Sequence, residues 1–181
     1  MIATGIATRA GSRLSATLRA GVIGGVVGAV TSWIYELIVW VRLLHLTSAY
    51  GIAENTAVLS FGPGIRALGA GAFALGVCIH FLTAVIWGIV FALIWPALRA
   101  RAIEATLAAL FYGIFAWVFM HNIVLALFSP APPTYTVYSV LNGLMAHTFA
   151  FSVPMALVIK RLLRLPSLPP VMRAFNNSFG V

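Results

Sequence analysis

Four long apolar stretches constrain the fold of this chain more than any other feature. Each is long enough for a helix to cross the hydrocarbon core of a bilayer, which takes about 20 residues. Only 8% of the residues are charged, whereas soluble domains carry about a quarter charged residues. The sequence therefore predicts an all-α membrane protein with four transmembrane helices in an up-down bundle. The predicted spans cover about residues 18–44, 69–95, 103–128 and 138–159.

Basic residues flank these spans and predict their orientation. Nine of the eleven Lys and Arg residues lie in the N-terminal region, in the linker after the second span, and after the fourth span. By the positive-inside rule, these three regions face the cytoplasm, so both termini are expected there. The chain then divides into an N-terminal arm (1–17), a transmembrane domain (18–164) and a proline-rich cytoplasmic tail (165–181).

The net charge of +8 does not indicate nucleic-acid binding. The basic residues border apolar segments and form no basic helical face with interleaved aromatics. The lipid bilayer is the expected partner, and no nucleic acid is expected. Cys78 is the only cysteine, which excludes an intramolecular disulfide, and we interpret it as a small buried hydrophobic residue.

Small residues form a stripe along the first predicted span. Gly21, Gly25, Gly28 and Ser32 recur at steps of four, three and four, which places them on one helical face. Such a stripe is typical of close packing against a neighbouring helix. Continuing the stripe reaches Glu36, which should therefore point into the bundle and be protonated, paired or coordinating, because a carboxylate inside a membrane costs about 3 kcal/mol.

Each of the four spans carries one ionisable side chain at a similar depth. With a rise of about 1.5 Å per residue, depth can be counted from the outer end of each predicted span. The estimates are about 12 Å for Glu36, about 16 Å for His80, about 10 Å for His121 and about 14 Å for His147. We therefore predict that these four residues form one intramembrane site that opens toward the outer face.

Several chemistries suit such a site. Three imidazoles and a carboxylate could bind a transition metal, or two of the histidines could hold haem. The cluster could also be a protonatable relay or sensor. A structural polar core, in which a histidine, Trp33 or Tyr35 satisfies Glu36, is a further alternative.

Motifs of the common enzyme classes are missing from the sequence. It has no HxxxH or HExxH element, no Walker or Rossmann glycine loop and no nucleophile elbow. A role without catalysis is therefore favoured. A protein of a different class also fits: an accessory subunit, or a homo-oligomer, that packs in a larger membrane complex through its glycine stripe and basic tails.

Three local features add expectations about the connections. Pro96 is expected to end the second span, because proline disrupts helix interiors. A short interfacial helix is expected around Glu54–Phe61. The uncharged, proline-broken turn Ser129–Pro133 is expected to form the outer rim of the site, between His121 and His147.

The ordered set of these elements resembles the YagU family of small bacterial inner-membrane proteins. The resemblance rests on Trp33-x-x-Glu36, on the run HFLTAVIWG that begins at His80, and on the positions of His121 and His147, and it covers Gly21–Arg164. Where family members often carry a proline-rich segment after the glutamate, this chain reads LIVWVR. The resemblance implies a multi-pass protein of the bacterial inner membrane without an established biochemical activity, in a family associated with acid tolerance.

Overall fold

The computed structural model describes residues 2–130 and 135–163, with side chains from Gly11 onward. The predicted tail (165–181) and the centre of the predicted turn lie outside the described residues. Within them the chain is helical and contains no strand. The elements are α1 Ile2–Glu36, η1 Leu37–Leu43, α2 Ala49–Phe61, η2 Pro63–Leu68, α3 Ala70–Ala100, α4 Ala105–Phe119, η3 Met120–Val124, α5 Leu125–Phe128, α6 Val137–Met145, η4 Ala146–Ser152 and α7 Val153–Leu163.

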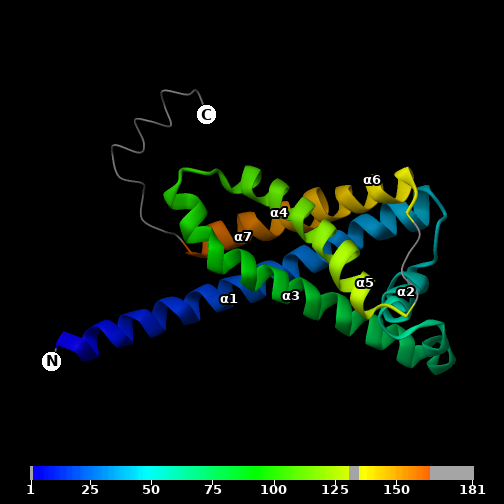
Figure 1. Cartoon of the computed structure of the whole chain (residues 1–181), viewed down its shortest axis with the longest axis horizontal. Coiled ribbons are helices and arrows are strands. Elements are labelled where there is room, and N and C mark those ends of the chain that lie inside the picture. The colour runs from blue at the N-terminus through cyan, green and yellow to red at the C-terminus, as the bar shows by residue number, and fades with distance from the viewer. Residues whose placement is uncertain (1, 131–134, 164–181) are drawn as a thin grey trace.

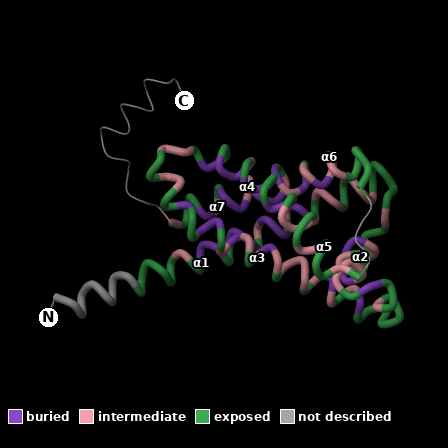
Figure 2. Tube along the Cα trace, in the orientation of Figure 1, coloured by how far each residue is buried: buried purple, intermediate pink, exposed green. Residues whose placement is uncertain are grey.

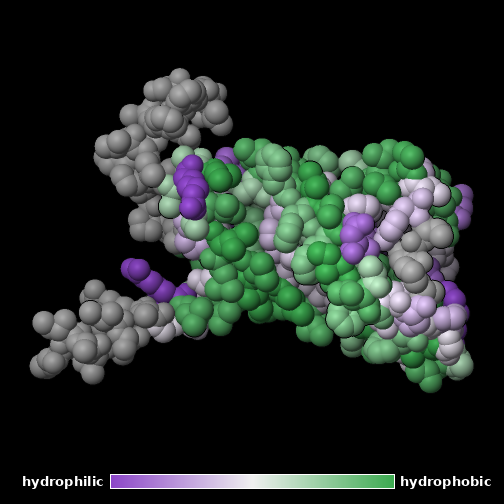
Figure 3. Space-filling view, in the orientation of Figure 1, coloured by the Kyte–Doolittle hydropathy of each residue, from purple (hydrophilic) through white to green (hydrophobic). Residues whose placement is uncertain are grey.

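These elements combine into four continuous helices that are long and apolar enough to cross a membrane. The four cover Gly11–Leu43, Ala70–Ala100, Ala105–Phe128 and Val137–Leu163. They pack side by side in Figure 1, and large apolar side chains cover much of their outer surface in Figure 3. The predicted fold class, a four-helix membrane bundle, is confirmed.

Two details differ from the sequence-based expectations. The helix α3 continues through Pro96 to Ala100. A proline this close to a helix end removes one backbone hydrogen bond, and neighbouring helices in a membrane bundle tolerate that loss. Cys78 is exposed on α3 rather than buried, because it faces away from the helices that pack on α3.

Glycines allow α1 to lie against two other helices. A Cβ added at Gly25 would lie 2.5 Å from the carbonyl oxygen of Ala84, and one at Gly21 would lie 2.6 Å from the Cα of Ile89, both on α3. A Cβ added at Gly28 would lie 2.7 Å from the ring of Phe151 on η4. Ser32 completes this face, and it is buried. The small-residue stripe is therefore fully used in contacts within the chain.

The apolar core lies where α1, α3, α4 and α7 meet. Phe91, Met155 and Ile159 are fully buried there, and alanines from all four helices fill the space between them. Buried segments concentrate in this part of Figure 2. The side chain of Tyr112 reaches α3 and donates a hydrogen bond of 2.6 Å to the carbonyl oxygen of Trp87.

The helix α2 lies outside the four spans and packs on α3. Gly76 permits this contact, because a Cβ at that position would overlap the carbonyl group of Ala53. Arg66 holds the other side of α2 through Glu54, at 3.2 Å, and Asn55, at 2.9 Å. The predicted short helix is therefore present, but it is longer than expected and it docks on the bundle.

Three stretches of the spans, η1, η3 and η4, are π-helical. In η4 the backbone N–H of Val153 bonds to the carbonyl of Thr148, five residues earlier. The next residue is Pro154, which has no N–H and leaves the carbonyl of Ala150 without its usual donor. The hydroxyl of Thr31 on α1 donates to that carbonyl at 2.6 Å, so a contact between helices replaces the missing backbone bond.

Candidate functional site

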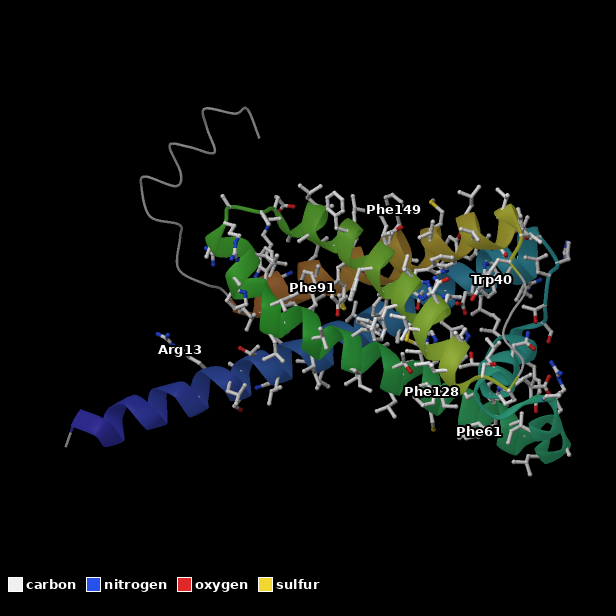
Figure 4. The ribbon with its side chains drawn as sticks, in the orientation of Figure 1. Arg13, Trp40, Phe61, Phe91, Phe128 and Phe149 are labelled. Carbon is white, nitrogen blue, oxygen red and sulfur yellow. The ribbon has the colours of Figure 1, made fainter. Side chains whose placement is uncertain are left out.

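A cavity of about 260 Å³ lies in the half of the bundle that carries α2. All four residues predicted from depth line it: Glu36, His80, His121 and His147. Most of the remaining lining is apolar or aromatic, and α2 closes one side. Trp40, labelled in Figure 4, belongs to the lining and lies in the half of the bundle away from Arg13, which is labelled near the start of α1.

His121 and His147 are in ring contact. The two ring centroids are 5.7 Å apart and the planes meet at 77°. Trp117 also stacks on His121, with ring centroids 4.6 Å apart. These two histidines, predicted as neighbours across the turn, are therefore brought together.

Hydrogen bonds to backbone carbonyls fix the tautomers of the three imidazoles. His121 and His147 each donate from Nδ1 to the carbonyl four residues earlier, at 2.9 Å. His80 donates from Nε2 to the carbonyl of Ala29 at 3.2 Å. Because a carbonyl oxygen can only accept, the bonded nitrogen of each ring carries the hydrogen. The second nitrogen of each neutral ring is then an acceptor.

Glu36 ends α1 at the junction with η1 and lines the same cavity. The partners expected in a purely structural core do not reach it. Tyr35 donates instead to Oδ1 of Asn142 at 2.6 Å, and the indole N–H of Trp33 is buried without a partner among the described residues. Trp33 packs against His80, with ring centroids 5.7 Å apart.

Trp40 and three residues of α2 also line the cavity, and the sequence did not identify them as site residues. The indole N–H of Trp40 is buried and has no partner in the described part of the chain. Its position four residues after Glu36 places it on the same helical face, and this spacing could have identified it. Asn55, Thr56 and Ser60 line the cavity from α2; their contribution depends on how α2 docks, which no local pattern reveals.

Two of the four predicted residues lie in π-helical segments, and a third borders one. Glu36 directly precedes η1, His121 lies in η3 and His147 lies in η4. Fewer than about 1% of residues in proteins are π-helical, and such turns occur often at functional sites. In η3 the N–H of Leu125 bonds to Met120, and the carbonyl of His121 accepts from the Tyr135 hydroxyl at 3.1 Å instead.

The geometry does not form a metal centre. Among the described residues, no group of three or more His, Cys, Asp or Glu side chains lies close enough together to hold a metal ion, whereas zinc sites use three or four ligands at about 2.0–2.3 Å. Haem also fits poorly. A cavity of about 150 Å³ holds one benzene ring, so about 260 Å³ is small for a macrocycle of four pyrrole rings.

No family model, curated protein or solved structure matches the chain. The cavity and the chemistry of its lining are therefore the basis for a functional proposal.

Proposed function

We propose that the protein binds a small, mostly apolar molecule with a hydrogen-bond donor inside the membrane, at a site that can accept a proton. In this proposal it is a multi-pass protein of the bacterial inner membrane with cytoplasmic termini. One observation supports it above all: an ionisable side chain from each of the four spans lines a single cavity.

The cavity's size and walls favour a compact ring compound. Since about 150 Å³ accommodates benzene, a volume of about 260 Å³ suits one ring with substituents or two fused rings. Trp40, Trp87 and Phe151 supply aromatic walls, and aliphatic side chains complete them. An apolar ligand body would replace water there at a gain in free energy.

The polar lining favours a ligand that donates hydrogen bonds. Three imidazoles each keep one acceptor nitrogen, and Glu36 adds a carboxyl group. A hydrogen bond from a ligand to one of these acceptors would contribute about 0.5–1.5 kcal/mol net. A phenol-type or quinol-type hydroxyl would satisfy one of them and could in turn accept from the indole N–H of Trp40.

A comparison of two ring compounds tests this proposal. Phenol and anisole share an oxygen-substituted ring, but only phenol donates a hydrogen bond. We expect the purified protein in nanodiscs to bind phenol at least about tenfold more tightly, which corresponds to about 1.4 kcal/mol. The quenching of tryptophan fluorescence on titration would measure both affinities.

Two variants make the test specific to the cavity. His147→Phe keeps a ring but removes the nitrogens, and it should reduce the preference for phenol to less than about twofold. His45→Asn is the control, because it also removes an imidazole, His45 is exposed and does not line the cavity, and asparagine tolerates the positive φ of 51° at this position. Equal binding of phenol and anisole would overturn the donor preference, and binding of neither would overturn the proposed function.

The accessory-subunit alternative relied on the glycine stripe of α1 as the surface that contacts a second protein. Gly21 and Gly25 lie against α3, and Gly28 lies against Phe151, all within this chain. The glycine stripe is thus not available to a second protein. No other described contact favours a partner over the cavity.

A further inference from the structure

A second cavity, of about 150 Å³, lies at the opposite end of the bundle. It lies between the end of α3, the start of α4 and the last turns of α7. Trp95, which is buried, contributes an apolar wall. The full lining is Trp95, Arg99, Ala102, Ile103, Glu104, Ala105 and Lys160.

Positive charge concentrates around this cavity. Arg99 and Lys160 line it, and the neighbouring Arg101 and Arg161 are exposed at the same end. Among the described residues of this group Glu104 is the acidic one, so four cations meet one anion and their net charge is 4 − 1 = +3. Hydrophilic side chains are visible at this end in Figure 3.

Both carboxylate oxygens of Glu104 already accept hydrogen bonds from this chain. Its Oε1 accepts from Nζ of Lys160 at 2.6 Å, and its Oε2 accepts from the backbone N–H of Thr106 at 2.6 Å, which caps α4. The Lys160 ammonium and these amide contacts lower the pKa of Glu104 to about 2. The carboxylate is therefore ionised at physiological pH. Its negative charge is already included in the net charge of +3 given above. The Lys160 ammonium has two further N–H donors.

We propose that this cavity binds the phosphate group of an anionic phospholipid, with Arg99 and Lys160 as the cationic contacts. Arginine and lysine both recognise phosphate, and basic pockets between transmembrane helices bind anionic headgroups.

Apolar surface beside the cavity favours a lipid over free phosphate. Leu93 and Ile94 on α3, six and five residues before Arg99, are exposed. Acyl chains from a headgroup in the cavity would run along such side chains.

Thermal unfolding of the full-length protein in mixed micelles tests the inference. Phosphatidylglycerol should raise the unfolding temperature by at least about 3 °C, and phosphatidylcholine with the same acyl chains should change it by less than about 1 °C, because only a ligand of the folded state stabilises it. Inorganic phosphate at the same concentration distinguishes the source. An equal shift with inorganic phosphate, or with phosphatidylcholine, would overturn the lipid assignment.

Variants then locate the contact. Arg99→Gln combined with Lys160→Gln should abolish the shift with phosphatidylglycerol. Arg66→Gln is the matched control, because Arg66 also pairs with a glutamate but lies at the other end of the bundle. Persistence of the shift in the double variant would overturn the inference.

A third variant covers the case in which the double variant does not fold. Glu104→Gln keeps both cations and removes the competing carboxylate. It should lower the unfolding temperature without lipid and enlarge the shift with phosphatidylglycerol. An unchanged or smaller shift would contradict a phosphate site at this cavity.

Discussion

The absence of one side chain, at Gly76, determines how closely α2 approaches α3. A Cβ there would overlap the carbonyl group of Ala53. Both residues are buried, so neither helix can move aside without losing packing. Since α2 supplies Asn55, Thr56 and Ser60 to the large cavity, this one residue influences the shape of the proposed binding site.

Gly76→Ala should therefore separate α2 from the bundle. Overpacking of a buried contact costs about 1–3 kcal/mol, and we expect a loss of this size in the free energy of unfolding, together with weaker phenol binding. Unfolding in detergent mixtures and fluorescence titration would measure the two effects. Gly11→Ala is the control, because a Cβ at Gly11 meets no atom within 4 Å. A loss of stability as large at Gly11 as at Gly76 would contradict this explanation.

The positions of the four ionisable residues could be predicted because helices rise regularly along the chain. Counting residues from the span ends placed Glu36 and the three histidines at one level, and they line one cavity. The tautomers and the approach of α2 could not be predicted. They depend on carbonyls such as that of Ala29 and on the contact between Gly76 and Ala53, which join distant parts of the sequence.

At the scale of the helices, π-helical turns replace regular backbone bonds with contacts between elements. Pro154 leaves the carbonyl of Ala150 without a backbone donor, and Thr31 supplies one from α1. The hydroxyl of Thr31 also contacts carbonyls of its own helix, at 2.9 Å and 3.2 Å. The hydrogen bond from Thr31 to Ala150 therefore joins α1 to η4 beside this proline.

A double-mutant cycle tests this compensation. Thr31→Val should cost about 1 kcal/mol in the free energy of unfolding, because it removes the donor to the partly buried carbonyl of Ala150. In a Pro154→Ala background the cost should fall, because the N–H of the new alanine can bond to Ala150. Chemical unfolding of the four proteins gives the coupling energy. An identical cost of Thr31→Val in both backgrounds would show that Pro154 does not determine the contact.

The sequence predicted the four long helices, but it did not predict the π-helical turns within them. The four spans follow from apolar length alone, and they are confirmed. The π-helical turns depend instead on which carbonyls find donors from other helices. For the same reason, Pro96 did not end α3 as expected: packing of α3 on its neighbours outweighs the loss of one backbone bond.

For the molecule as a whole, basic residues are distributed unequally between the two ends of the bundle. Arg99, Arg101, Lys160 and Arg161 lie at one end, whereas Arg66 is paired with Glu54 at the end that carries α2. The positive-inside rule then predicts that the four cations face the cytoplasm.

Labelling of single cysteines in intact cells tests this orientation. In a Cys78→Ala background, Gly64→Cys should react with a membrane-impermeant maleimide, and Ala100→Cys should react only after the cells are permeabilised. Both positions are exposed, and a Cβ at Gly64 meets no atom within 4 Å. The reverse pattern would place the large cavity nearer the cytoplasmic face.

The cavity has one ionisable residue from every span, and this arrangement has a consequence for biogenesis. The ribosome completes Glu36 long before His147, so a carboxyl group enters the membrane while most of its surroundings do not yet exist. A carboxyl group inside the membrane costs about 3 kcal/mol, and the lining of the cavity beside it is complete only once the fourth span has inserted. A chain whose synthesis stops before His147 therefore leaves the cavity beside Glu36 open on the side that the fourth span would line.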